Sequence, residues 1–123
     1  MNYKQTHNAF GLNPGTRFFY IVRDEKRYCG RSIGTAEIVS VSFSPKLHVP
    51  TFAVRGIDMA FYGMTEWKVR RSDLHRVFLS KTEAAEQLVA ECCGSLFRID
   101  KQSIAKMEDA IRIYRETEKE GIV

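Results

Sequence analysis

The sequence of 123 residues has little that would place it in a membrane or an oxidising compartment. No apolar run approaches the roughly 20 residues of a membrane-spanning helix, and the polar residues 1–8 lack the apolar core of a signal peptide. There are three cysteines, an odd number, and Cys92 and Cys93 fall next to each other in a predicted helix, which is poor geometry for a mutual disulfide. We therefore expect a cytoplasmic protein whose thiols are reduced and pack as small hydrophobic side chains.

Sequence motifs of the common enzyme classes are also absent. There is no phosphate-binding P-loop, no G-x-G-x-x-G dinucleotide motif and no G-x-S-x-G nucleophile elbow. His7, His48 and His75 stand far apart, none in an H-x-x-x-H or C-x-x-C context, so no metal site is predicted. This length allows one packed domain and excludes kinases and TIM barrels. We expect a single domain over residues 1–123 that is not an enzyme and uses no cofactor.

Charge is distributed unevenly, although the formal net charge is only +4. Residues 1–80 carry twelve basic and six acidic side chains, a net charge of +6, whereas residues 81–123 carry seven basic and nine acidic ones, a net charge of −2. A region of positive potential attracts anionic ligands. An anionic partner is therefore expected at the first region or at its junction with the second.

The first two thirds of the sequence have the pattern of short β-strands. Residues 16–22 form a dense aromatic and β-branched run after a turn signal at residues 13–15, and the charged residues 23–26 predict a hairpin connection. Residues 57–63 suit either a helical turn or a short strand. Further strands are expected at residues 27–31, 36–43, 51–55, 67–70 and 76–79. About five short strands predict a small antiparallel β-barrel or a curved sheet over residues 1–79.

One of these strands has a clear alternation of side chains. In residues 36–43, Val39, Val41 and Phe43 alternate with Ser40 and Ser42. Because successive side chains of a strand point to opposite faces, the three apolar residues are predicted to share the buried face.

Two helices are expected in residues 80–123. Ser80 followed at the third position by Glu83 fits a capping box at a helix N-terminus, and Gly94 supplies the C-terminal stop. The predicted buried face of this first helix consists of Ala84, Ala85, Leu88, Val89 and Cys92. The fold class is therefore predicted to be α+β, with a β core followed by two C-terminal helices.

The second helix, which we expect to be capped by Asp100, carries a narrow apolar seam. Its members are spaced 3, 4 and 3 residues apart and are Ile104, Met107, Ile111 and Tyr114. About three turns carry this seam, which excludes a long coiled coil. The seam is expected to pack on its own domain or against a symmetry mate, so a homo-oligomer through the C-terminal helices is predicted.

Basic and aromatic residues form two candidate ligand-binding sets. The first set comprises Trp67, Lys68, Arg70, Arg71, His75, Arg76 and Phe78, and the second comprises Phe97, Arg98, Arg112, Tyr114 and Arg115. Arginine forks bind phosphates and aromatic rings stack on bases, so each set can form a nucleotide or nucleic-acid surface. An ordinary strand with a solvated basic turn also explains the first set. Helical ion pairs of Arg112 with Glu108 and Glu116 also explain its place in the second.

The passage from Arg76 to Leu88, a final strand that leads straight into a capped helix, resembles the end of many small β-core proteins encoded by phages and prophages. With the second helix, the layout is similar to that of the phage anti-Thoeris sponges, which place a β core before two C-terminal helices and sequester cyclic ADP-ribose signals. The resemblance implies a ligand that is bound and not cleaved, with its pyrophosphate against arginines, its base on an aromatic ring and an oligomer interface closing the pocket.

Such a protein would act in the host cytoplasm. The resemblance supplies no matched motif, so the ligand-binding residues are chosen by residue type and placement. They are Arg71, Arg76, Phe78, Phe97, Arg98, Arg112 and Arg115.

Two other functions also fit the sequence. A regulator could bind nucleic acid through the basic β region, as small SH3-like or OB-like barrels do. A protein–protein inhibitor could block a nuclease or another immune effector. The net charge of +6 favours nucleic-acid binding, whereas the apolar seam suits the sponge and the inhibitor equally.

Overall fold

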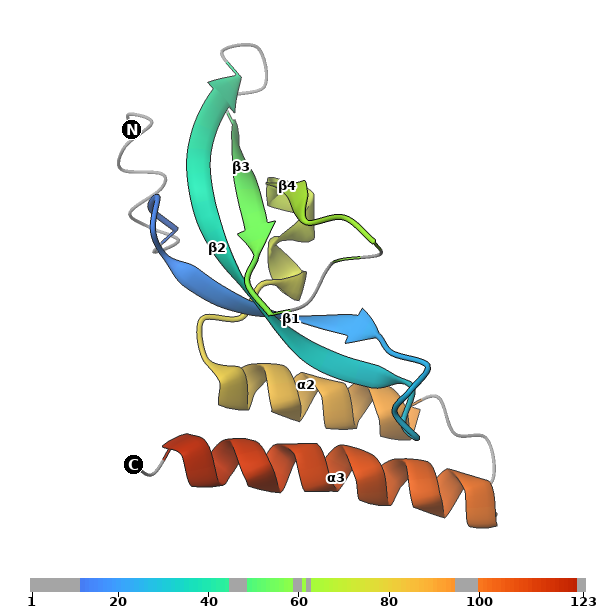
Figure 1. The fold of residues 1–123 in the computed structure, drawn as a ribbon. Coiled ribbons are helices and arrows are strands. Elements are labelled where there is room, and N and C mark those ends of the chain that lie inside the picture. Colours follow the sequence, from blue (N-terminus) through green and yellow to red (C-terminus); the bar gives the residue numbers. More distant parts are fainter. Residues whose placement is uncertain (1–11, 45–48, 59–60, 62, 95–99, 122–123) are drawn as a thin grey trace.

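The computed structural model describes residues 12–44, 49–58, 61, 63–94 and 100–121 (Figure 1). It has a four-stranded antiparallel sheet in the order β1-β2-β3-β4, followed by a 3-10 helix and two C-terminal helices. The elements are β1 (Arg17–Arg23), β2 (Arg31–Ser44), β3 (Val49–Gly56), β4 (Glu66–Arg70), η1 (Arg71–Arg76), α2 (Lys81–Gly94) and α3 (Lys101–Gly121). The predicted α+β class with two C-terminal helices is confirmed.

The sheet departs from the prediction in its strand number and in its closure. It is not closed into a barrel, and the described residues form four strands rather than about five. The strand expected at 27–31 is mostly a turn, in which Asp24 N donates to Gly30 O and Gly30 has a φ of +77°. The strand expected at 76–79 is reduced to one bridge between Phe19 and Phe78, because the 3-10 helix η1 occupies the chain up to Arg76.

A β-bulge breaks the alternation expected in β2. The register between β2 and β3 shifts between Ile38 and Ser40, so that Val39 is 49% exposed while Val41 packs against the core. The prediction that Val39 and Val41 share the buried face was therefore wrong. A bulge inserts one residue into one strand, which reverses the face to which the following side chains point.

The first strands of the sheet are packed on both faces. One face carries the sheet cluster, whose buried members are Leu12, Phe18, Tyr20, Val22, Ala36, Ile38, Phe52, Val54 and Val69. The other face lies against α2, which packs on α3, and carries the helix cluster, whose buried members are Cys29, Leu88, Cys92, Ala110 and Ile113. Figure 1 shows the two helices lying along one side of β1 and β2. Alternation along β1 explains this division, because Tyr20 and Val22 face the sheet cluster whereas Ile21 faces the helices.

The helix boundaries agree with their predicted caps. α2 begins directly after Ser80, whose carbonyl accepts the Ala84 N–H, and it ends at Gly94. At the start of α3, Ser103 N donates to Asp100 Oδ1 at 2.8 Å. This backbone hydrogen bond lowers the pKa of Asp100 below its ordinary value. The sequence therefore located the starts of both helices.

The buried face of α3 differs from the apolar seam. Ile104 is 43% exposed, and the other seam residues are only half-buried. The buried positions are instead occupied by Asp109, Ala110, Ile113 and Thr117, of which only Ile113 is a large apolar residue. Thr117 Oγ1 donates to Ile113 O at 2.9 Å, which satisfies its hydroxyl inside the packed layer. Packing of the seam against a second copy stays a prediction.

Candidate functional site

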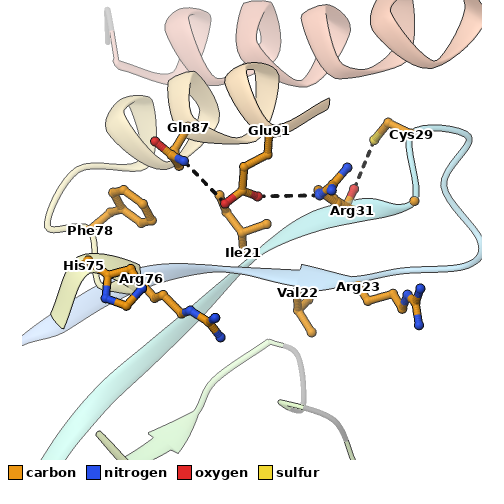
Figure 2. Close-up of a pocket in the computed structure, with 11 residues that line it drawn as sticks. Ile21, Val22, Arg23, Cys29, Arg31, His75, Arg76, Phe78, Gln87 and Glu91 are labelled. Atoms are coloured by element: carbon orange, nitrogen blue, oxygen red, sulfur yellow. Dashed lines mark hydrogen bonds and ion pairs between the residues drawn. The ribbon is translucent and has the colours of Figure 1, made fainter. Parts of the chain in front are cut away.

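A groove of about 590 Å³ lies where the sheet meets α2 (Figure 2). Its walls come from the end of β1, the start of β2 with the turn before it, the end of η1 with the segment after it, and α2. The lining residues are Ile21, Val22, Arg23, Cys29, Gly30, Arg31, His75, Arg76, Phe78, Gln87 and Glu91. The groove thus lies at the junction of the basic β region and the helical region, where the charge distribution predicts an anionic partner.

Phe78, which lines the groove, forms a bridge with Phe19 of β1. Phe19 N donates to Phe78 O at 2.7 Å, and Phe78 N donates to Phe19 O at 2.9 Å. These bonds tie the segment after η1 to the outer edge of β1. They also bring the half-buried ring of Phe78 to the groove, on the same side of β1 as Ile21 and the α2 residues (Figure 2).

Three arginines line the groove, and their charges are only partly balanced. Arg23 and Arg76 are exposed, and neither takes part in an ion pair with any residue in the described part of the chain. Arg31 Nε lies 3.5 Å from Glu91 Oε2, and Gln87 Nε2 donates to Glu91 Oε1 at 3.4 Å. The lining therefore carries three guanidinium groups and a single carboxylate, which leaves an excess of positive charge at the groove.

A buried carboxylate fixes the wall formed by the β1–β2 turn. Asp109 Oδ1 accepts from Arg27 Nη2 at 3.1 Å and from Arg112 Nη1 at 3.2 Å, and Asp109 Oδ2 accepts from Cys29 N at 3.1 Å. Burial raises the pKa of Asp109, but the hydrogen bonds from Cys29 and Arg27 outweigh it and the pKa is lowered overall. The ionised carboxylate therefore holds the turn against α3 at neutral pH.

The cysteine in this wall is not activated for chemistry. Cys29 Sγ donates to Arg31 O at 3.3 Å, and burial raises the pKa of the Cys29 thiol above its ordinary value. A protonated thiol is a poor nucleophile. All three cysteines are free thiols.

The structure brings together only part of the predicted ligand-binding set. Arg76 and Phe78 line the groove. Arg71 is the first residue of η1, and ligand binding by its side chain stays a prediction. Arg112 and Arg115 lie on α3 outside the lining. The two remaining members, Phe97 and Arg98, lie outside the described residues.

Arg112 has a structural partner that differs from those expected. It pairs with Asp109 three residues earlier, rather than with Glu108 or Glu116. Ligand binding by Arg112 and Arg115 stays a prediction.

Sequence reasoning missed Arg23 and Arg31. These two residues are cross-strand partners at the end of β1 and the start of β2. The signal was present in the sequence, because both arginines flank the predicted hairpin connection and a closed hairpin brings its two ends together. Gln87 and Glu91 on α2 were also missed, because only the packing of α2 on the sheet places them in the groove.

Trp67, a member of the first candidate set, is used inside the fold. Its ring stacks on Phe61 with a centroid distance of 5.1 Å and meets Tyr20 edge to face at 5.3 Å. It packs against the sheet cluster and does not line the groove. Its aromatic ring therefore serves packing in this structure.

Comparison with known proteins does not assign the groove. Protein-family models, curated proteins and solved structures all give no match to the chain. Neither α2 nor α3 is long and apolar enough to cross a membrane. Within the described ranges, no group of three or more His, Cys, Asp or Glu side chains could hold a metal ion. The functional argument therefore rests on the groove and its basic lining.

Proposed function

We propose that the protein is a phage-type anti-defence protein that binds a cyclic nucleotide signal such as cyclic ADP-ribose in the groove and sequesters it without cleavage. The observation that carries this proposal is that Arg23, Arg31 and Arg76 line one groove together with the aromatic ring of Phe78. Guanidinium forks match phosphate oxygens, and an aromatic ring offers a stacking face for a base. The volume of about 590 Å³ lies within the usual range for small-molecule sites.

The charges of the groove suit a ligand with two phosphates. Arg23 and Arg76 are exposed and lack ion pairs within the described residues, so a pyrophosphate can bind them without displacing a carboxylate. Arg31 Nε lies 3.5 Å from Glu91 Oε2. This ion pair is long enough for an incoming anion to compete with Glu91 for the guanidinium group. Since the Cys29 thiol is protonated, the lining favours binding over covalent chemistry.

The test is cyclic ADP-ribose binding measured by calorimetry and by thermal shift. The wild type is expected to bind the nucleotide, to show a raised Tm, and to release the nucleotide intact after denaturation. The double variant Arg23→Ala/Arg76→Ala is expected to bind at least about tenfold more weakly, because two charge-assisted contacts are lost. The matched control Arg17→Ala/Lys68→Ala removes two exposed positive charges outside the groove and should bind as the wild type does. Unchanged binding by Arg23→Ala/Arg76→Ala would refute the assignment of the site.

The proposal includes a homo-oligomer formed through the C-terminal helices. Its support is the apolar seam of α3, where Ile104 is 43% exposed and Met107, Ile111 and Tyr114 are half-buried. Light scattering after gel filtration should give a mass above that of one chain. Ile104→Glu should reduce this mass, and a monomeric wild type would contradict this part of the proposal.

A second candidate function is nucleic-acid binding, which the basic groove and the net charge of +6 over residues 1–80 also favour. The two functions differ in salt dependence. Binding of a single-stranded oligonucleotide should weaken steeply as salt rises, because each neutralised phosphate releases counterions. Fluorescence anisotropy over a salt series distinguishes them. If neither ligand class changes the Tm, the protein–protein inhibitor becomes the favoured function.

A further inference from the structure

The backbone of β1, and not only its side chains, contributes to the groove. β1 is the first strand in the order β1-β2-β3-β4, so its outer edge has no neighbouring strand among the described residues. In an antiparallel ladder, the N–H and C=O groups of alternate residues point to opposite edges. Phe19 directs both groups away from β2 and bonds Phe78 with them, whereas Asp24 N bonds Gly30 O across the hairpin. Ile21 and Arg23 therefore direct their N–H and C=O groups to the outer edge.

These outward groups lie at the groove. Ile21, Val22 and Arg23 are consecutive lining residues, although the Ile21 side chain faces the helix cluster and the Val22 side chain belongs to the sheet cluster. A cavity that touches both faces of a strand runs along the edge of that strand. Among the described residues, the outward backbone groups of Ile21 and Arg23 have no backbone partner, unlike those of Phe19.

We infer that this open edge of β1 binds the base of the nucleotide, with Ile21 C=O as hydrogen-bond acceptor and Arg23 N–H as donor. The inference rests on the proposed function and names the part of the ligand that the arginines do not bind. Adenine presents an amino donor beside a ring-nitrogen acceptor, which is the complement of that pair. The edge of an adenine base meets the strand, and its face packs on the Ile21 and Phe78 side chains on the α2 side.

The length of the open edge favours a base over a peptide. At one end the edge is closed by the Phe19–Phe78 bridge, and at the other β1 ends at Arg23, after which Asp24 turns back toward Gly30. An added peptide strand gains its affinity from a row of main-chain hydrogen bonds. Only Ile21 and Arg23 remain to supply them here, which is enough for one base edge and too few for a strand.

The charges around the edge suit the same arrangement. Arg23 and Arg31 are cross-strand partners at one end of the groove, and Arg76 lies on the opposite side of β1 from Glu91 (Figure 2). When a base is bound at Ile21 and Arg23, its attached phosphates lie near these three guanidinium groups. Side chains therefore bind the phosphates, and backbone groups select the base.

The experiment compares three probes on the same full chain by calorimetry and by amide chemical shifts in NMR. The probes are ADP, N6,N6-dimethyl-ADP, which lacks the amino donor, and inorganic pyrophosphate, which lacks the base. ADP is expected to bind at least about tenfold more tightly than the dimethyl analogue, which should bind like pyrophosphate. ADP should shift the Arg23 N–H signal downfield relative to the dimethyl analogue. The Val22 N–H, which points toward β2, is the internal control and should give the same signal with both nucleotides.

Each other outcome overturns the inference in a distinguishable way. If the dimethyl analogue matches ADP in affinity and in Arg23 shift, the edge does not bind the amino group, although phosphate binding by the arginines stands. If all three probes and cyclic ADP-ribose fail to bind, the proposed function itself fails. If poly-glutamate shifts the Ile21 and Arg23 amides and ADP does not, the edge binds an acidic peptide instead.

Discussion

The two clusters that pack against the sheet differ in the kinds of side chains that they contain. The sheet cluster contains large apolar side chains, including Phe18 and Phe52, and it is joined by the aromatic contacts of Tyr20 with Phe61 and Trp67. The helix cluster has no aromatic member among the described residues and lies next to the buried carboxylate of Asp109. Its buried side chains are Cys29, Leu88, Cys92, Ala110 and Ile113. Buried apolar area therefore stabilises the first cluster, whereas a polar contact orients the second.

This difference explains where the groove lies. Large side chains fill the interior of the sheet cluster, where the space between the described side chains is too small for a ligand. The helical layer meets the sheet through the side chains of the helix cluster and through the Asp109 contact with the β1–β2 turn. Where the helical layer meets the sheet, the outer edge of β1 has no neighbouring strand among the described residues, and charged side chains lie around it.

The largest expected effect comes from the sheet cluster. Phe52 is 1% exposed, so Phe52→Ala removes a full aromatic side chain and leaves a cavity, at an expected cost of about 4 kcal/mol in the free energy of unfolding. Leu88→Ala in the helix cluster should cost about 3 kcal/mol. Urea unfolding followed by circular dichroism measures both, with Lys68→Ala on the exposed face of β4 as control. A greater loss at Leu88 than at Phe52 would reverse the comparison.

The polar contact of the helical layer should be nearly as costly to remove. Asp109→Ala leaves Arg27 and the Cys29 N–H without their partner and is expected to lower the free energy of unfolding by about 3 kcal/mol. Asp109→Asn, which keeps an acceptor for the Cys29 N–H, should lose less. Equal stability of Asp109→Ala and the wild type in urea would show that the turn is held by other contacts.

The same carboxylate predicts a pH dependence. The folded-state pKa of Asp109 lies below its ordinary value of 3.8, so its contribution to stability is present above that value and is lost as pH falls through the folded pKa. The stability difference between the wild type and Asp109→Asn should therefore be constant near neutral pH and shrink below about pH 4. Urea unfolding over a pH series measures it. A difference that grows on acidification would contradict the assigned pKa direction.

A glycine of β2 tests how tightly the sheet cluster is filled. A Cβ on Gly34 would clash with the Tyr20 ring, which is itself in edge-to-face contact with Phe61 and Trp67. Gly34→Ala is expected to cost about 2 kcal/mol because the ring cannot move away freely. In a Tyr20→Ala background the same substitution should cost much less, as a double-mutant cycle in urea would show. Equal costs in both backgrounds would mean that the ring is not the obstacle.

The sequence predicts the local features of the helical region but not those that depend on contacts between distant residues. Helix starts depend on local signals, and both Ser80 and Asp100 marked them correctly. The apolar seam that includes Ile104 did not identify the face that α3 buries within its own domain, where the packing selects Ala110 and Asp109. A long-range contact with Cys29, 80 residues away in sequence, makes that choice, and no local pattern reports it.

The candidate site was predictable to a similar extent. Arg76 and Phe78 were identified from a local cluster of basic and aromatic residues. Arg23 and Arg31 required the hairpin register, and Glu91 required the docking of α2 on the sheet. The bulge at Val39 could not be foreseen either, because it depends on the pairing of β2 with β3. Local chemistry was therefore visible in the sequence, and its assembly across elements was not.

The smallest expected effects come from two exposed ion pairs, one in each region. Arg55 Nη2 lies 3.2 Å from Glu37 Oε2 across β2 and β3, and Lys81 Nζ lies 2.8 Å from Glu120 Oε2 between α2 and α3. Glu37→Gln and Glu120→Gln should each cost less than about 0.5 kcal/mol, because exposed pairs are screened and hold two flexible side chains.

These two substitutions are matched, because each replaces one carboxylate with a neutral amide of similar shape. Urea unfolding at low and high salt should show both small losses vanish as salt rises. If Glu120→Gln costs more than about 1 kcal/mol while Glu37→Gln costs nothing, surface charge as well as Asp109 orients the helical layer. Equal small losses would leave the buried carboxylate as the contact that sets the position of the helices, and with it the width of the groove.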